Sequence, residues 1–387
     1  MPDWPTVRFE ELSADEKSAI TKPYGSAFTK ADYTPHGIPV IRGVNLGNGI
    51  FLDDDFVFVS IEKADEMPGA NLLPGDLVFT HRGTIGQVSM VPRSPRYPRY
   101  TLSTSQVKAR LDTTQALPEF YYYWFRSPRG QESILAHVST VGVPGLVQPV
   151  ATIKSLRVPH PPLLEQQAVT EVLGALDEKI AANERLAIYS IELGRSLLQQ
   201  ATKVQPRAVT VGEFAVLTYG KALPEPKRFP GESPVFGCTG QVGWHNSPLT
   251  ESQCPVVGRK GANAGHVSWM PKSGWVIDTA FFAKPVSSEI NMQALYFLLD
   301  AAGLKSLIGD SAVPGVNRNT ALAHPTRIPG PEQLPHFCEE ARELLRVLVQ
   351  AEAENDTLAS LRDTLLPQLV AGKIRVKDAE KIVEDAA

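Results

Sequence analysis

Residues 143–163 read VPGLVQPVATIKSLRVPHPPL, and residues 313–333 read VPGVNRNTALAHPTRIPGPEQ. Each stretch opens on Val-Pro-Gly and carries another proline fifteen residues after the first one. A long amphipathic run then begins near Leu163 in the first copy and near Leu334 in the second. The two copies are offset by 170 residues throughout. A repeat with this period indicates two globular units, each followed by a long helix.

A glycine-rich segment precedes each copy. Residues 82–92 read RGTIGQVSMVP, and residues 260–271 read KGANAGHVSWMP. Nearby runs rich in Val, Ile and Phe, bounded by Gly, Pro and Asp, predict strands. Residues 118–137 and 292–308 predict a helix packed on each sheet, and the aromatic run at 120–125 is better explained by core packing than by base stacking.

The expected fold class is α+β, with two pseudo-symmetric mixed α/β domains joined by two long antiparallel coiled-coil helices. The expected domains are residues 1–160 and 205–330, both globular. Residues 161–204 form the central helix, and residues 331–387 form the distal helix and C-terminal tail.

Both predicted helices carry an apolar stripe with a spacing of three or four residues, which is typical of a coiled-coil seam. The stripe includes Leu186 and Leu193 of the first helix. Asn183 and Asn355 lie on it near the middle of each helix. They are interpreted either as a register lock or as two independently tolerated polar residues. The seam is predicted to contain Leu173, Leu176, Ile180, Asn183, Leu344, Leu348, Asn355 and Leu358.

Composition limits the class of protein. The chain has 387 residues, 43% of them hydrophobic and 21% charged, which predicts two or three folded units. Three cysteines without CxxC spacing indicate a reducing, cytosolic setting with neither a disulfide framework nor a zinc site. No signal peptide and no apolar run of about 18 residues is found, so we expect a cytoplasmic protein outside the membrane.

The net charge of −4 is unevenly distributed. Residues 205–330 carry 11 basic and 8 acidic groups, whereas residues 331–387 carry 7 and 12. Residues 77–111 and 252–277 contain basic side chains and no acidic ones. Two locally basic faces on an acidic chain fit contacts to phosphates, although a solvated basic loop explains the charge equally well.

Signatures of catalysis are missing from the sequence. There is no GxxxxGK[ST], no HExxH, no GxSxG and no Asn/Asp-Pro-Pro-Tyr methyltransferase segment. The eight histidines lack metal-ligand spacing, and the acidic cluster at residues 53–55 is better explained as a solvated turn. We therefore expect no catalytic residue and no bound metal.

Three segments resemble the specificity subunits of Type I restriction–modification systems. Residues 161–180, PPLLEQQAVTEVLGALDEKI, resemble the opening of their central helix. Residues 361–376, LRDTLLPQLVAGKIRV, resemble the end of their distal helix, and residues 74–86, PGDLVFTHRGTIG, resemble a segment of their target-recognition domains. The second copy departs from this pattern, because His336-Phe337 stands where the first copy has Gln166-Gln167.

The resemblance implies a subunit that reads a bipartite, asymmetric site on double-stranded DNA, one half-site per recognition domain. It implies as partners two methyltransferase subunits docked on the helices and translocating restriction subunits. S-adenosylmethionine, ATP and magnesium would belong to those partners, so no cofactor is expected on this chain. Half-sites on one face of a duplex would lie roughly 34 Å apart.

Phosphate contacts require Lys or Arg, whereas bases are read by Arg, Asn or Gln in the major groove. Candidate DNA-binding residues of the first domain are Arg82, Arg93, Arg96, Arg99, Gln106, Lys108 and Gln148. Those of the second are Arg259, Lys260, Asn263, Asn317 and Arg318. Two other readings stay open: a coiled-coil scaffold with repeated protein-binding domains, and a fused methyltransferase, which the missing signatures disfavour.

Overall fold

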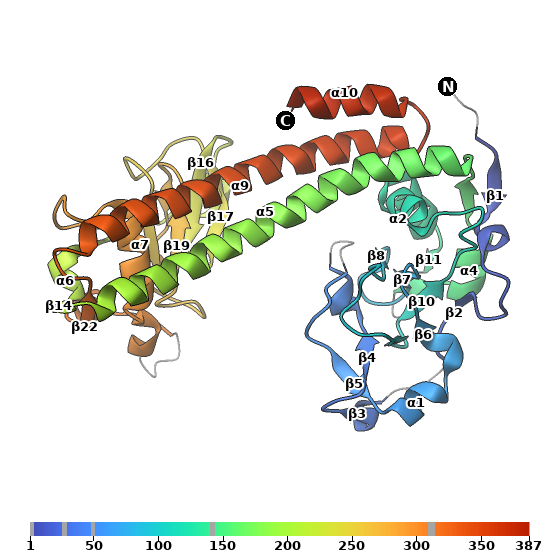
Figure 1. Ribbon diagram of the computed structural model, residues 1–387, viewed down its shortest axis with the longest axis horizontal. Coiled ribbons are helices and arrows are strands. Elements are labelled where there is room, and N and C mark those ends of the chain that lie inside the picture. Colours follow the sequence, from blue (N-terminus) through green and yellow to red (C-terminus); the bar gives the residue numbers. More distant parts are fainter. Residues whose placement is uncertain (1–3, 25–28, 48–50, 140–143, 309–313, 387) are drawn as a thin grey trace. The chain divides into compact units, whose positions relative to one another are not determined.

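The computed structural model describes residues 4–24, 29–47, 51–139, 144–308 and 314–386. Val143 and Val313, which open the repeated segments, lie outside these residues. The chain forms two compact units, the first from Met1–Lys179 with Thr357–Ala387 and the second from Ile180–Asp356 (Figure 1). Each unit therefore contains one predicted globular domain and part of both long helices.

The first unit is built on a four-stranded antiparallel sheet in the order β2-β10-β7-β8. The strands are β2 (Ile20–Thr21), β10 (Gln106–Ala109), β7 (Leu77–Thr80) and β8 (Val88–Met90). Every residue of β7 and β10 is buried. A separate antiparallel pair is formed by β1 (Thr6–Arg8) and β13 (Arg157–Pro159).

The second unit repeats this arrangement. Its antiparallel sheet has the order β15-β21-β18-β19. The strands are β15 (Ala215–Tyr219), β21 (Ala280–Pro285), β18 (Cys254–Gly258) and β19 (Val267–Met270), and β14 (Arg207–Thr210) pairs with β22 (Pro325–Ile328). The repeat seen in the sequence is thus a repeat of topology, and the predicted α+β class is confirmed.

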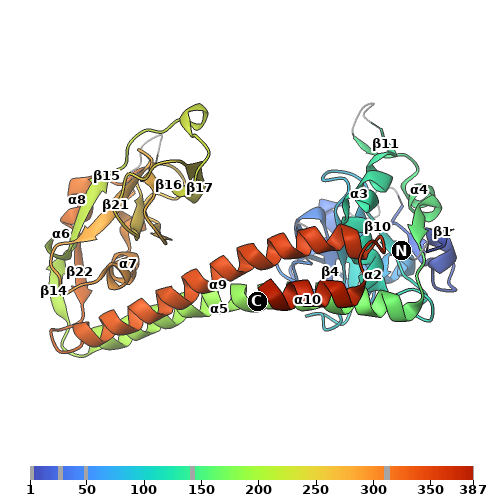
Figure 2. The ribbon, with the colours of Figure 1, turned by 90° about the horizontal axis from the view of Figure 1, so that it is seen from above.

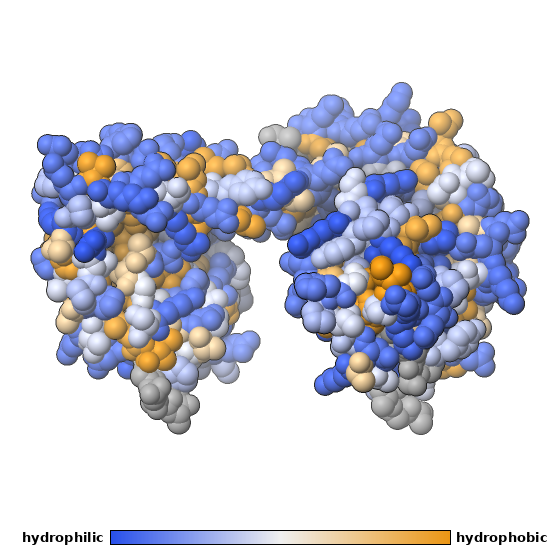
Figure 3. Space-filling model, turned by 60° about the horizontal axis from the view of Figure 1, so that its bottom comes forward, coloured by the Kyte–Doolittle hydropathy of each residue, from blue (hydrophilic) through white to orange (hydrophobic). Residues whose placement is uncertain are grey.

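The units differ in their additional strands. The first unit has a five-stranded sheet in the order β3-β5-β4-β9-β6, and the second a three-stranded sheet in the order β17-β16-β20. The first set comprises β3 (Tyr33–Thr34), β5 (Val57–Val59), β4 (Ile38–Ile41), β9 (Tyr100–Leu102) and β6 (Asn71–Leu72). The second set comprises β17 (Gly240–His245), β16 (Ser233–Gly237) and β20 (Trp275–Val276). On the face drawn in Figure 3, each unit is largely hydrophilic, with separate apolar patches.

The predicted helix at 118–137 is two helices, α2 (Pro118–Arg126) and α3 (Pro128–Leu135). The break has a local cause, because the Ser127 hydroxyl accepts a hydrogen bond from the Gly130 amide at 3.2 Å and caps α3. The aromatic residues 120–125 are all buried, which confirms their expected place in the core. In the second unit, α7 (Met292–Ala301) ends before Gly303, whose φ of 69° is left-handed.

The long helices are α5 (Leu163–Lys203) and α9 (Leu334–Leu369), and both begin where the sequence predicted. They lie side by side and antiparallel (Figure 2). In the first unit Asp177 of α5 accepts hydrogen bonds from Arg362 Nη1 of α9 and from the Tyr123 hydroxyl of α2, both at 2.8 Å. A further helix, α10 (Val376–Ala386), occupies part of the predicted C-terminal tail.

Most predicted seam residues are buried, including Leu173, Leu176, Asn183, Leu348 and Leu358. Ile180, Leu344 and Asn355 are partly buried.

The prediction that Leu186 and Leu193 continue this stripe is wrong, because their side chains are 45% and 50% exposed. In the second unit the buried face of α5 turns towards α7, and it passes through Ala187, Ile191 and Gly194 instead. The globular core, rather than a pure two-helix seam, sets the buried face there.

The two seam asparagines each reach the opposite helix. Asn183 Nδ2 donates to Glu354 Oε2 at 2.8 Å, and Asn355 Nδ2 donates to the Ile180 carbonyl at 3.3 Å. They are not paired with each other through these bonds. A role in setting the helix register stays a prediction, now with Glu354 as the partner of Asn183.

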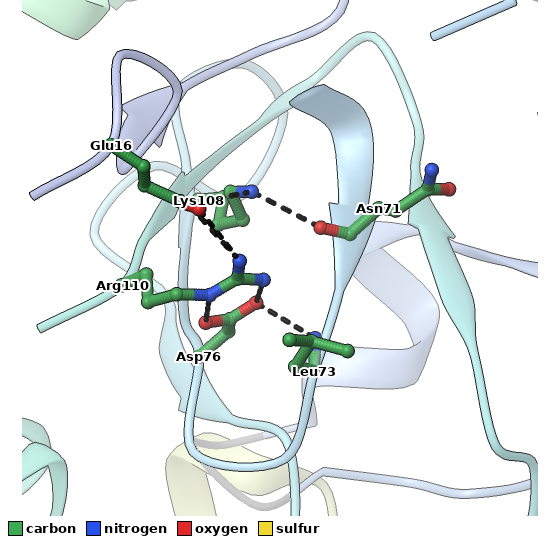
Figure 4. Close-up of polar contacts among 6 residues, drawn as sticks. All are labelled: Glu16, Asn71, Leu73, Asp76, Lys108 and Arg110. Atoms are coloured by element: carbon green, nitrogen blue, oxygen red, sulfur yellow. Dashed lines mark hydrogen bonds and ion pairs between the residues drawn. The ribbon is translucent and has the colours of Figure 1, made fainter. Parts of the chain in front are cut away.

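Two candidate DNA contacts, Gln106 and Lys108, lie inside the first unit on β10. Both side chains are about 1% exposed. Lys108 Nζ donates to the Asn71 carbonyl at 3.1 Å and lies 4.0 Å from Glu16 Oε1 (Figure 4). The Gln106 amide oxygen accepts a hydrogen bond from the Ser103 hydroxyl. These two assignments are corrected, because a side chain enclosed in a sheet cannot contact DNA.

The charges beside Lys108 are closely paired. Arg110 donates two hydrogen bonds to Asp76, from Nε at 2.8 Å and from Nη2 at 2.7 Å, and Asp76 is almost fully buried (Figure 4). Arg110 Nη1 also reaches Glu16 at 3.0 Å. Burial, followed by the nearby Arg110 charge, lowers the pKa of Lys108. This buried ammonium therefore costs stability wherever it is charged.

The two glycines of α5 make a matched test of helix packing. A Cβ added at Gly194 would lie 2.3 Å from the ring of Phe297 in α7, whereas one added at Gly174 meets nothing within 4 Å. We expect Gly194→Ala to destabilise the protein by about 1–3 kcal/mol through overpacking. Gly174→Ala should stabilise it by about 0.4–1 kcal/mol. Urea unfolding measures both, and equal effects would contradict this packing.

The Lys108 ammonium should make stability depend on pH. Since its folded-state pKa is below the unfolded one, the unfolded chain binds more protons between those values, and wild type gains stability as pH rises through this window. We expect the free energy of unfolding of wild type, relative to that of Lys108→Met, to increase from neutral pH towards about pH 10.4, which is the pKa of lysine in an unfolded chain. Urea unfolding at several pH values tests this. The exposed Lys30→Met is the control, and a flat difference for Lys108→Met would contradict the assignment.

Candidate nucleic-acid interface

The basic face of the second unit is organised by one backbone bridge, between Lys260 and Gly315. Lys260 follows β18, and Gly315 belongs to the repeated Val-Pro-Gly segment. The bridge brings the glycine-rich loop next to the start of α8 (Arg318–Leu322). Four of the five predicted residues of this domain converge there. A hollow of about 340 Å³ is lined by Tyr219, Arg259, Lys260, Gly315, Val316, Asn317 and Arg318.

Local contacts fix these side chains. Asn317 caps α8, since its Oδ1 accepts from the amides of Asn319 at 2.9 Å and Thr320 at 3.3 Å. Arg259 Nη1 donates to the Asp278 carbonyl at 3.1 Å. With the Asn317 oxygen occupied, this side chain offers its amide N–H donors. Together with the two arginines and Lys260, they make the face rich in donors and suited to acceptor groups.

Asn263, the fifth predicted residue, is partly exposed on the same glycine-rich loop but does not line the hollow. Its carbonyl accepts from the His266 amide at 3.0 Å, which helps to shape the loop. Its role as a DNA contact stays a prediction.

The first unit has the equivalent bridge, between Arg82 and Gly145. Arg82 is exposed, and Gln148 is exposed at the N-cap of α4 (Pro149–Ser155) with a left-handed φ of 43°. Gln148 borders a second hollow of about 350 Å³. Its other lining residues are Lys17, Ile20, Thr21, Lys22, Tyr24, Pro149, Val150, Ala151 and Lys154. Both units therefore have a bridge and a basic hollow, but in the first unit neither bridge residue lines the hollow.

Sequence reasoning missed Lys17, Lys22 and Lys154 in the first unit and Tyr219 in the second. Lys22 follows β2, which has two residues and gives no periodic signal. The repeat offered one clue, because Lys154 lies six residues after Gln148 in the stretch that matches Asn317 and Arg318. Only the tertiary structure brings these lysines together around one hollow.

The remaining candidates of the first domain, Arg93, Arg96 and Arg99, lie away from this hollow. Arg93 pairs with Glu119 at 2.5 Å and Arg99 with Asp65 at 2.6 Å. The Arg96 guanidinium lies 5.6 Å from the ring centroid of Tyr97. These three side chains have structural partners, and their contact with DNA stays a prediction.

The residues that the structure describes contain no group of three or more His, Cys, Asp or Glu side chains that could hold a metal ion. No helix among them is both long and apolar enough to cross a membrane.

Comparison with known proteins gives a family match for part of the chain and a similar fold for most of it. The family described as Type I restriction modification DNA specificity domain matches residues 9–190. The S subunit of a Type-I restriction-modification system from M. genitalium has a similar fold, with a TM-score of 0.62 and 19% sequence identity. That similarity covers 95% of this chain and 96% of the other. A comparison with curated proteins found no match.

Two further structures align with lower scores. The HsdS subunit from Thermoanaerobacter tengcongensis has 16% identity and a TM-score of 0.38, covering 97% of this chain and 98% of that one. A structure described as complex assembly and conformational transition of the type I R-M system has 17% identity and a TM-score of 0.44, covering 97% and 99%. With scores below 0.5, neither adds to the M. genitalium likeness. The family model therefore identifies a Type I restriction modification DNA specificity domain in residues 9–190, and the M. genitalium likeness shows a shared fold over most of the chain.

Proposed function

We propose that this chain reads a bipartite DNA site, with one half-site bound by each unit. The observation that carries the proposal is the repeated basic face. In both units a backbone bridge joins the second residue after a central strand to the glycine of the Val-Pro-Gly segment. In both units a hollow lined by basic side chains also includes the N-cap residue of the helix that follows this segment. Such faces supply the phosphate contacts and base-edge donors that duplex recognition needs.

The two half-sites should differ in sequence. The first hollow has three lysines, Lys17, Lys22 and Lys154, whereas the second has two arginines, Arg259 and Arg318, and a single lysine, Lys260. Lysine is a compact point charge, while arginine presents a planar fork of donors. Faces with such different donors would not select the same bases, so the target is asymmetric.

The chain supplies specificity, and its partners supply the chemistry. S-adenosylmethionine, ATP and magnesium would bind to methyltransferase and restriction subunits, and this chain would hold none of them. The missing catalytic signatures in the sequence support that division.

A methyltransferase subunit would dock on the outer face of α5 in the second unit. Leu186, Tyr189 and Leu193 are 45%, 61% and 50% exposed and follow one another at helical spacing. An apolar stripe left in water on a long helix is typical of a protein interface.

Removing two lysines from the first face should weaken DNA binding and reduce its dependence on salt. Each phosphate contact that is lost lowers the slope of log K against log salt by about 0.9. We therefore expect Lys22→Ala with Lys154→Ala to reduce the slope by up to about 1.8. Titration of a randomised duplex pool measures it, and Lys30→Ala is the matched control. Wild-type binding that does not depend on salt concentration would favour a protein-binding scaffold instead.

A charge on the α5 stripe should separate docking from DNA recognition. We expect Leu193→Glu to reduce co-purification with the methyltransferase subunit, because a carboxylate would be buried in an apolar contact. Binding of the randomised duplex pool should be unchanged. Ile61→Glu, at an equally exposed site in the first unit, is the control. Normal co-purification of Leu193→Glu would exclude this face.

A further inference from the structure

We propose that Tyr219 is a positioning residue that holds Arg259 and Arg318 so that they read guanine in the half-site of the second unit. This inference rests on the proposed DNA-binding function and deepens it. It names the base class that this unit selects and the aromatic side chain on which the selection depends.

The geometry joins one ring to two guanidinium groups. The central carbon of Arg259 lies 4.8 Å from the ring centroid of Tyr219, and that of Arg318 lies 5.7 Å from it. Both distances are within the range of cation–π attraction, which is about 6 Å. The Tyr219 ring is therefore shared by two arginines that come from different segments of the chain.

The ring itself is held by the core. Tyr219 is the last residue of β15, and its ring lies 5.0 Å from that of Phe281, which is fully buried on the neighbouring strand. The other side of Tyr219 is open, and 45% of the residue is exposed. A platform anchored on one side and open on the other can orient arginines at the surface.

Arg259 is held at one nitrogen, and both arginines have donors left over. Arg259 Nη1 is bound to the Asp278 carbonyl, which limits the rotation of its guanidinium. Arg318 Nε is buried and has no hydrogen-bond partner among the described residues. Two neighbouring cations and a donor-rich hollow require an acceptor-rich ligand. In a duplex, the guanine edge with O6 and N7 presents two acceptors that match a planar guanidinium.

The first unit has a lysine in place of the Tyr219 ring. Thr21 lies opposite Lys108 in the first sheet, and Thr218 lies opposite Phe282 at the corresponding place in the second. The two threonines are therefore equivalent. The residue that follows is Lys22 in the first unit and Tyr219 in the second. A flexible lysine suits a phosphate, whereas a ring that stacks arginines favours a fixed planar donor pair. The tyrosine that stands in the second unit in place of this lysine supports base reading there.

The experiment selects bound sequences from a randomised duplex library with the full chain. Wild type should enrich guanine at one or two positions of one half-site. Tyr219→Phe, which keeps the ring, should retain that preference. Tyr219→Leu should lose it at those positions and keep the preferences of the other half-site. Arg318→Lys, which keeps the charge and loses the fork, should lose it in the same way.

A second measurement identifies the atom that is read. Replacing the enriched guanine by 7-deazaguanine removes the N7 acceptor and should weaken wild-type binding about tenfold or more. Tyr219→Leu should respond several-fold less to the same replacement. A residue with a merely structural role would not change the response to a single atom of DNA.

The outcomes are distinguishable. If wild type enriches no sequence, the proposed function itself fails. If wild type enriches two half-sites and Tyr219→Leu selects the same bases, the present inference alone is overturned. A uniform loss of binding on all sequences would make the arginines phosphate contacts and overturn it as well. Tyr33→Leu, at an exposed tyrosine of the first unit, is the control for loss of a ring, and thermal melting checks that each variant is folded.

Discussion

The basic face of the second unit depends on one small constraint, a backbone bridge between Lys260 and Gly315, which has a counterpart between Arg82 and Gly145 in the first unit. A basic residue that leaves a central strand is tied to a segment far away in the chain. Donors from the glycine-rich loop and from the following helix cap therefore share one surface. Without this bridge, Lys260 and Arg318 of the second unit would belong to separate loops.

The two units share a sheet topology but differ in the side chains at equivalent positions. At the position in the central sheet where the second unit has Phe282, the first has Lys108, buried and bound to the Asn71 carbonyl. Phe282 contributes apolar packing, whereas Lys108 needs the nearby carboxylates and a carbonyl to be tolerated. At the edge strand the difference is reversed, since Tyr219 replaces Lys22. The topology is shared while the surface chemistry differs, which fits the proposed reading of an asymmetric site.

Much of the fold could be predicted because its signals are local. Both long helices begin where the apolar periodicity begins, at Leu163 and Leu334. The prediction failed at Leu186 and Leu193, where α5 leaves the two-helix seam to pack on α7. A stripe of apolar residues shows that a helix has a partner, but Gly194 against Phe297 is a contact between distant segments. Periodicity alone cannot say which face such a contact will bury.

The sequence by itself determined the two units, their long helices, and the arginines, lysine and asparagine of the second basic face, because a repeat and a charge pattern are present along the chain. Tertiary structure decided which cations are available. It buried Lys108 beside Asn71, left Lys22 and Lys154 at a hollow, and placed Tyr219 beneath two arginines. The physical reason is that strand pairing, which joins residues far apart in sequence, sets whether a side chain points into the sheet or towards solvent.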